Sequence, residues 1–298
     1  MLGMRLFRLF GALLLLSAAC SLFESSDPNA VDDDPTWSPD GRTIAYIRYQ
    51  SKNPGLYLIE IDGRNNRVLL DGKWICPAWS PDGQWLVFST AYEGTIYKVK
   101  VNGDSLTQLT TRGRNFFPDW SVANKIVFDS DASNLRGGYC LWTMDPDGSN
   151  KRNISEQEAQ GWRDASWSPD GSRMVFYRYY PGGGSASDLA IMDSSGQNQV
   201  RLTDDSYDER GPSWSPDGSA IAVSRAHYEP YRIWILDLES MNWTRLPPED
   251  ALSPTWSPDA EQICFRKCEP PDTGWQFHET GKLWIMDRDG RNARQLTK

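Results

Sequence analysis

Hydrophobic and polar positions alternate in short segments along most of this chain, and the same arrangement returns six times. The first copy opens on Trp37, continues through the polar run Ser38-Pro39-Asp40-Gly41, and is followed by the alternating segment Ile44-Ala45-Tyr46. Short alternating segments bounded by Pro, Asp and Gly are typical of β-strands, whereas a helix repeats its apolar positions every three or four residues. The pattern therefore predicts an all-β protein.

Six tryptophans mark the repeat, at positions separated by 42, 41, 47, 47 and 42 residues: Trp37, Trp79, Trp120, Trp167, Trp214 and Trp256. The turn is altered in two copies, where Ala260 replaces the glycine and where Val122-Ala123-Asn124 replaces Pro-Asp-Gly. A period of about 40 residues is that of one β-propeller blade. The sequence thus predicts a six-bladed β-propeller over residues 34–298, with blades that start near residues 34, 76, 117, 164, 211 and 253.

Each repeat contains the patterns of four antiparallel strands. The second is rich in β-branched and aromatic residues, as in Leu86-Val87-Phe88, and the third ends in Asp before a Gly turn, as in Asp145-Pro146-Asp147-Gly148. The chain enters its first repeat at Pro35, in a first strand, and its last repeat finishes at Thr297, in a fourth strand. We therefore expect no strand exchange at closure, and packing between blades alone to close the ring.

Residues 1–19 have the layout of a secretory signal peptide. Arg5 and Arg8 precede an apolar stretch and the small residues Ser17-Ala18-Ala19. Because Cys20 follows directly, the segment is typical of a bacterial lipoprotein signal, in which the cysteine becomes the lipidated first residue. An ordinary cleaved signal is the alternative. Residues 20–33 are acidic and poor in large apolar residues, which predicts a flexible tether.

Charge and composition narrow the possible partners. The chain has 31 basic and 40 acidic residues and a net charge of −9. This balance argues against nucleic acid and against a polybasic contact with anionic lipid. We therefore expect an exported protein in the periplasm or on the cell surface, in contact with the membrane through its lipid anchor only.

The repeats also resemble those of a known family. The pattern Pro-x-Trp-Ser-Pro-Asp-Gly, then Leu-Trp-Ile-Met-Asp-x-Asp-Gly as at Leu283, then Arg-x-Leu-Thr as at Arg294, is similar to the repeats of TolB-like β-propellers and less closely to WD repeats. The resemblance covers residues 34–298 and implies a six-bladed propeller. TolB proteins carry an additional N-terminal α/β domain, for which a 14-residue tether leaves no room.

The residues that support catalysis or metal binding are few. Only two histidines occur, His227 and His278, and no Gly-x-Ser-x-Gly motif is present, so we expect no metal, no cofactor and no hydrolase elbow. Four cysteines beyond Cys20 could form disulfides in an exported protein, and their pairing stays open: Cys76, Cys140, Cys264 and Cys268.

Positions that break the repeat are the candidates for function. Eleven residues beyond the tryptophan, at the end of the second strand, four consecutive blades of the closed ring carry a basic residue: Arg48, Arg178, Arg225 and Lys267. They predict a basic arc on one face, where Trp74, Trp162 and Tyr228 are also expected. Arg with Tyr and Trp is typical of interface cores, and aromatic rings with Arg also suit acidic sugars. Alternatively, each Arg pairs with a neighbouring carboxylate and the aromatic residues cover the bases of the loops.

These patterns favour a non-catalytic, envelope-tethered binding propeller that recognises a protein or an acidic envelope polysaccharide through this face. The alternative is a glycan-active enzyme of the lyase or hydrolase type. In that case the arginines would hold the carboxylates of an anionic saccharide, and a Tyr or His227 would act as the base.

Overall fold

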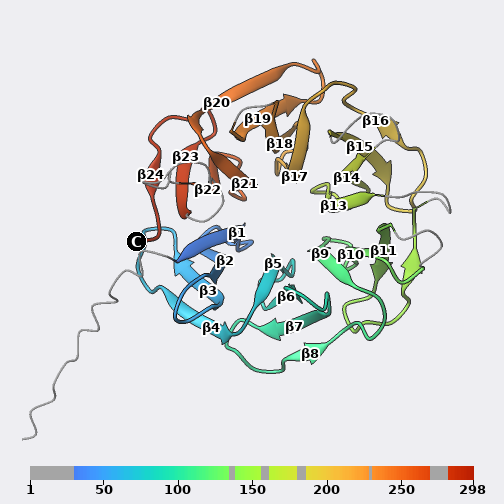
Figure 1. Ribbon diagram of the computed structural model, residues 1–298, viewed down its shortest axis with the longest axis vertical. Coiled ribbons are helices and arrows are strands. Elements are labelled where there is room, and N and C mark those ends of the chain that lie inside the picture. Colours follow the sequence, from blue (N-terminus) through green and yellow to red (C-terminus); the bar gives the residue numbers. More distant parts are fainter. Residues whose placement is uncertain (1–29, 134–137, 156–160, 180–185, 228–229, 269–280) are drawn as a thin grey trace, which may run out of the picture.

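The computed structural model describes residues 30–133, 138–155, 161–179, 186–227, 230–268 and 281–298. Within these ranges the chain forms six four-stranded antiparallel sheets that surround a central axis (Figure 1). No described segment is a long apolar helix of the kind that crosses a membrane. The expected all-β, six-bladed propeller is confirmed.

Each blade consists of four consecutive strands, from the first at the axis to the fourth at the rim (Figure 1). Blades 1 and 2 contain β1 (Val31–Trp37), β2 (Thr43–Tyr49), β3 (Gly55–Glu60), β4 (Arg67–Asp71), β5 (Trp74–Trp79), β6 (Trp85–Thr90), β7 (Ile96–Lys100) and β8 (Thr107–Gln108). Blades 3 and 4 contain β9 (Asn115–Trp120), β10 (Ile126–Ser130), β11 (Cys140–Met144), β12 (Arg152–Asn153), β13 (Trp162–Trp167), β14 (Arg173–Tyr179), β15 (Ser187–Asp193) and β16 (Val200–Arg201). Blades 5 and 6 contain β17 (Asp208–Trp214), β18 (Ala220–Ala226), β19 (Arg232–Asp237), β20 (Trp243–Glu249), β21 (Ala251–Trp256), β22 (Gln262–Lys267), β23 (Lys282–Asp287) and β24 (Arg294–Gln295). Among the described strands, no sheet combines strands from the two ends of the chain, in agreement with the expectation of no strand exchange.

The hydrophobic core is divided into six clusters, one between each pair of neighbouring blades. The cluster between the last and first blades joins Trp37, Ile44 and Tyr46 to Cys264 and Ile285. Burial of one large apolar side chain contributes about 1.5–3 kcal/mol. A blade alone would expose both of its apolar faces, and the closed ring buries them all.

The repeated turn is stabilised by its own side chains. The hydroxyl of Ser38 donates to Asp40 Oδ1 (2.6 Å) and accepts from the backbone N–H of Thr43 (3.0 Å). Gly41, at φ 70°, donates its N–H to the Ser38 carbonyl (2.9 Å). The same serine–aspartate contact recurs at Ser80, Ser168, Ser215 and Ser257. We call the face of the ring that carries these turns the turn face, and the opposite face, on which the inner strands begin, the loop face.

The propeller begins three residues earlier than the sequence suggested. β1 starts at Val31, so Asp32 and Asp33 belong to the first strand and not to the tether. Both carboxylates form ion pairs, with Arg48 and Arg266 respectively (2.6 Å each), and this pairing offsets the cost of burying an acidic run.

Closure of the ring uses more than packing between blades. The N–H of Asp32 donates to the Gly281 carbonyl (2.9 Å), and the indole N–H of Trp37 donates to the Thr255 carbonyl (3.2 Å). The indole of Trp79 makes the equivalent bond to Thr36 (3.1 Å) between blades 1 and 2. The last and first blades are therefore joined by the same kind of contact as other neighbours.

Candidate functional site at the central channel

All six inner strands carry a β-bulge at the same position, three residues before the blade tryptophan. The bulged residues have φ values between 49° and 60°: Asp34, Cys76, Phe117, Asp164, Gly211 and Ser253. The strand register shifts at each of these points. A bulge bends a strand and increases its local twist. Here the bend lies in the innermost strand of each blade, next to the central axis. Five of the six residues are not glycine and adopt an unfavourable left-handed conformation.

The bulges are held by groups from other strands. The N–H of Cys76 donates to Asp34 Oδ2 of blade 1 (2.9 Å), and the N–H of Asp164 donates to Asp129 Oδ1 of blade 3 (3.0 Å). The N–H of Ser253 donates to the hydroxyl of Ser224 in blade 5 (3.0 Å). Each of these bonds crosses from one blade to the next, so closure of the ring itself stabilises the strained residues.

These residues line a cavity of about 160 Å³ on the axis, to which all six blades contribute. Burial raises the pKa of Asp34 to about 7; the charges of Asp33 and Asp164 add to this effect, and the Cys76 N–H opposes it. Burial also raises the pKa of Asp164 to about 6, against the opposing effects of Arg163 and the Gly211 N–H. Among the described residues, no Lys or Arg forms an ion pair with either carboxylate. We call Asp34 and Asp164 the throat carboxyls.

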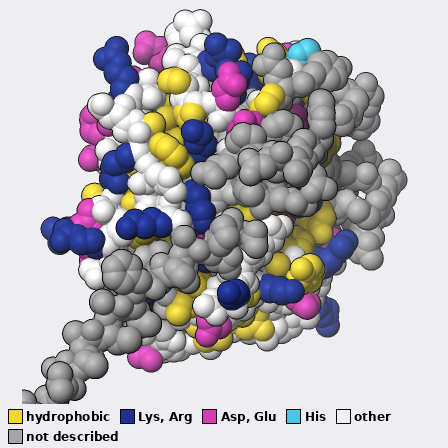
Figure 2. All heavy atoms as spheres, turned by 60° about the vertical axis from the view of Figure 1, so that its left-hand side comes forward, with side chains coloured by type: hydrophobic (Ala, Val, Ile, Leu, Met, Phe, Trp, Pro, Cys, Tyr) yellow, Lys and Arg dark blue, Asp and Glu magenta, His cyan; other side chains and the backbone are white. Residues whose placement is uncertain are grey.

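Ion pairs surround the channel on its loop face. Asp33 binds Arg266 from the neighbouring blade (2.6 Å), and Arg163 binds Asp129 (2.9 Å), again between neighbouring blades. Arg163 also lies 4.2 Å from the ring centroid of Tyr139. A third pair, between Arg210 and Asp208 (2.8 Å), lies beside Tyr231. On the side of the ring that Figure 2 shows, basic and acidic side chains are likewise intermixed.

Strand register places the four residues of the predicted basic arc at equivalent positions on the loop face. Two of them are committed to ion pairs within their own blade. Arg48 binds the fully buried Asp32 through two hydrogen bonds (2.6 and 3.1 Å) and lies 4.8 Å from the ring of Tyr57. Arg225 is 5% exposed and binds Glu209 (2.8 Å) and Asp205.

The other predicted residues also contact their own blades. Arg178 lies 5.1 Å from the ring of Trp162, and the Lys267 ammonium lies 4.6 Å from the ring of Trp284. Trp162 is fully buried and stacks on Phe176 at 4.7 Å. Trp74 packs edge-on against Phe88 at 5.1 Å. Tyr228 and the lipidation candidate Cys20 lie outside the described residues.

Sequence reasoning missed the residues that form the channel. In five repeats the bulged residue can be recognised because it precedes a proline. The residues that bond across blades, Asp129, Ser224 and Arg266, lie one position before the end-of-strand position that defines the basic arc. His227, the base of the enzymatic alternative, contacts Ser206 (3.1 Å) and is not among the residues that line the cavity.

Possible metal ligands and the cysteine thiols are the other groups that could support chemistry. Among the described residues, no cluster of three or more His, Cys, Asp or Glu is positioned to hold a metal ion. Cys76, Cys140, Cys264 and Cys268 form no disulfide within the described part of the chain. Burial, followed by the charges of Asp34 and Asp164, raises the pKa of the Cys76 thiol well above its usual range, so that thiol stays protonated.

Solved structures of other proteins share the six-bladed fold of this chain. The chain is similar to a candidate TolB from Agrobacterium tumefaciens, with a TM-score of 0.68 and 23% identity over 80% of this chain and 86% of that one. An oligogalacturonate lyase in complex with manganese has the same fold, with a TM-score of 0.60 and 14% identity over 91% of this chain and 79% of that one. Both likenesses concern the fold alone.

A curated relative, the uncharacterised protein Atu1656 of Agrobacterium fabrum, is 30% identical over 158 residues, which are 49% of this chain and 54% of the relative. The match thus spans about half the length of that relative. The family model of the TolB beta propeller domain matches residues 32–218 and 134–269. Because these two matches together cover most of the chain, the protein belongs to the family of TolB β-propeller domains.

Proposed function

We propose that this chain is a non-catalytic binding propeller, exported and held in the cell envelope by a lipid on Cys20, that recognises a protein at the loop-face mouth of its central channel. The observation that carries the proposal is the pair of throat carboxyls. Neither forms an ion pair with a described residue, while the mouth around them presents Arg163, Arg210 and Tyr231. Arginine and tyrosine are enriched in interface cores, and a cationic side chain of a partner would meet both carboxylates.

The charge distribution favours a protein over an acidic polysaccharide. Arg48 and Arg225 already bind Asp32 and Glu209 within their own blades, so half of the predicted arc is engaged by the chain itself. A polyanion approaching the channel would also meet Asp34 and Asp164, and repulsion between like charges would oppose its binding.

The test is recovery of bound material from a detergent-solubilised envelope extract by the purified full-length chain. The throat variant is Asp34→Asn with Asp164→Asn, which removes both ionisable carboxyls and keeps a residue type that tolerates positive φ. A matched control, Asp147→Asn with Asp289→Asn, makes the same pair of substitutions at exposed carboxyls on the turn face. We expect a defined protein to be recovered by the wild type and the control, and its recovery to fall about tenfold with the throat variant.

Equal recovery by wild type and throat variant, at unchanged melting temperature, would remove the channel mouth from the proposal. Recovery of an acidic polymer in place of a protein would replace the partner class. Fractionation of cells that express wild type and Cys20→Ala tests the anchor separately.

A glycan-active enzyme is the second candidate, because two carboxyls with pKa values raised to about 6 and about 7 could act as acid and base near neutral pH. The cavity of about 160 Å³ is, however, smaller than the roughly 300–1,000 Å³ of small-molecule sites. Release of product from acidic oligosaccharides by the wild type, and its loss in Asp164→Asn, would favour the enzyme.

A further inference from the structure

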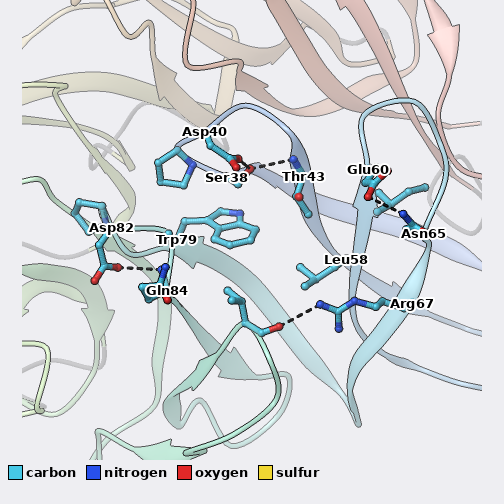
Figure 3. Close-up of a pocket in the computed structure, with 15 residues that line it drawn as sticks. Ser38, Asp40, Thr43, Leu58, Glu60, Asn65, Arg67, Trp79, Asp82 and Gln84 are labelled. Atoms are coloured by element: carbon cyan, nitrogen blue, oxygen red, sulfur yellow. Dashed lines mark hydrogen bonds between the residues drawn. The ribbon is translucent and has the colours of Figure 1, made fainter.

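The blade tryptophans differ in one respect that the repeat does not predict. Five of them are 4–8% exposed: Trp37, Trp120, Trp167, Trp214 and Trp256. Trp79 is only half-buried. It lies in a groove of about 560 Å³ between blades 1 and 2 on the turn face, a volume typical of small-ligand sites. Figure 3 shows its indole ring amid the residues that line this groove.

At two of the other five blade tryptophans, the chain itself supplies a cation. Arg173, the first residue of β14, lies 5.3 Å from the ring of Trp214 in the next blade. Arg288, directly after β23, lies 5.9 Å from the ring of Trp256 in its own blade.

At Trp79 both of these positions hold small uncharged side chains. The first residue of β2 is Thr43, and the residue after β7 is Val101; both line the groove. Arg67, the one basic residue among those that line it, donates to the Val101 carbonyl (3.2 Å) and, in Figure 3, lies apart from the indole ring. At Trp79, therefore, no described residue lies over the ring as Arg173 does at Trp214 and Arg288 at Trp256.

The groove is also acidic. Glu60, Asp40 and Asp82 line it, and none of them forms an ion pair with a described residue. Hydrogen bonds from Ser38 and Ser80 lower the pKa values of Asp40 and Asp82, so both are ionised at neutral pH. In each, the turn engages Oδ1. Glu60 accepts from the Asn65 amide (2.6 Å).

We propose that this groove binds an organic cation, a guanidinium or alkylammonium group, over the face of Trp79 and between the carboxylates of Asp40, Asp82 and Glu60. An aromatic ring attracts a cation through its quadrupole, and nearby carboxylates add Coulomb attraction. The cation is either a free small molecule or an Arg or Lys side chain of a partner. The site lies on the face opposite the channel mouth, so it does not depend on the proposed function.

The test observes the indole N–H resonances of the ¹⁵N-labelled full chain during titration with agmatine, choline and, as a neutral control, glucose. The Trp79 resonance is assigned from Trp79→Phe. We expect agmatine or choline, but not glucose, to shift it, and the affinity to fall as salt rises. A second arm adds a short peptide with a central Arg and a matched peptide with Gln. Tighter binding of the Arg peptide than of agmatine would indicate a partner side chain, and equal or weaker binding a free cation.

Two reciprocal variants make the test specific. Thr43→Arg copies the Arg173 arrangement into blade 1. It is expected to weaken cation binding at least tenfold, because the new guanidinium covers the face of the Trp79 indole ring. Arg173→Thr opens the equivalent position in blade 4 and is expected to make the Trp214 resonance sensitive to the same cations. A response of Trp79 to glucose alone, no response to either cation at millimolar concentration, or unchanged binding in Thr43→Arg would overturn the proposal.

Discussion

Arg266 of the last blade and Asp33 of the first, 233 residues apart in the chain, form an ion pair of 2.6 Å. It crosses the interface between these two blades, which we call the seam of the ring. The two side chains are 5% and 16% exposed, and Asp33 also accepts from the hydroxyl of Ser253 (3.0 Å). The pair therefore joins the two ends of the propeller beside the channel mouth.

Removal of one partner should weaken the seam. Asp33→Ala leaves the Arg266 charge without its carboxylate in a largely buried position, and the free energy of unfolding should fall by about 3 kcal/mol. Urea unfolding followed by tryptophan fluorescence measures this change. Arg64→Ala, which breaks the exposed pair with Asp62 (side chains 80% and 40% exposed), is the control and should change nothing measurable. Equal effects of the two variants would contradict a special role for the seam pair.

Substitutions of Arg225 and Glu209, which form a buried pair, should have non-additive effects on the free energy of unfolding. Burial raises the pKa of Glu209 to about 8, and the hydrogen bond from Arg225 opposes that rise. Arg225→Met alone leaves the carboxyl buried without its partner and should cost about 3–5 kcal/mol. The double variant Arg225→Met with Glu209→Leu should recover most of that loss, because no buried polar group is then left without its partner. Additive effects in this double-mutant cycle would show that the two residues act independently.

Stability should decrease as pH rises through neutrality. The pKa values of Asp34, Asp164 and Glu209 are raised in the folded state to about 7, 6 and 8, above their unfolded values. Between about pH 4 and pH 8 the folded state therefore binds more protons than the unfolded state, and the free energy of unfolding falls with rising pH. We expect a melting temperature higher by roughly 5 °C at pH 5 than at pH 8.

The throat variant provides the control for this pH dependence. Asp34→Asn with Asp164→Asn removes two of the three groups and should flatten the curve between pH 5 and pH 8. An unchanged slope would assign the effect to other carboxyls.

The proposed lipid anchor predicts a difference in location. If Cys20 is lipidated, wild-type protein should sediment with membranes and incorporate labelled fatty acid, whereas Cys20→Ala should be soluble after export. A Cys140→Ala variant, which removes a buried thiol of the propeller, is the matched control and should stay in the membrane fraction. Membrane association of Cys20→Ala would favour a different mode of attachment.

Local interactions made the framework predictable. The Ser38-Pro39-Asp40-Gly41 turn is recognisable because its hydrogen bonds join residues at most five positions apart. Strand positions followed from alternation for a similar reason, since one face of each strand packs against a neighbouring blade. The acidic run at Asp32 and Asp33 was misread as tether because its partners, Arg48 and Arg266, lie 16 and 233 residues away.

The candidate site was less predictable. A residue before proline tends to be extended, yet Asp34 and Cys76 are left-handed, held through a hydrogen bond that crosses between blades. The sequence offset correctly indicated the face on which Arg48 and Arg225 lie. It could not indicate that buried carboxyl groups of the first strand, Asp32 and Glu209, already bind them.

By itself, the sequence determined the number of blades, the strands in each and the turn that connects them, because these depend on local alternation and on hydrogen bonds within a few residues. Only the tertiary structure decided which carboxyls form no ion pair with a described residue and which blade tryptophan stays partly exposed. Contacts such as Arg173 over Trp214, or Asp34 with Cys76, join residues about one repeat apart and form only when neighbouring blades dock. The charge and exposure of these groups are therefore properties of the closed ring and not of any single repeat.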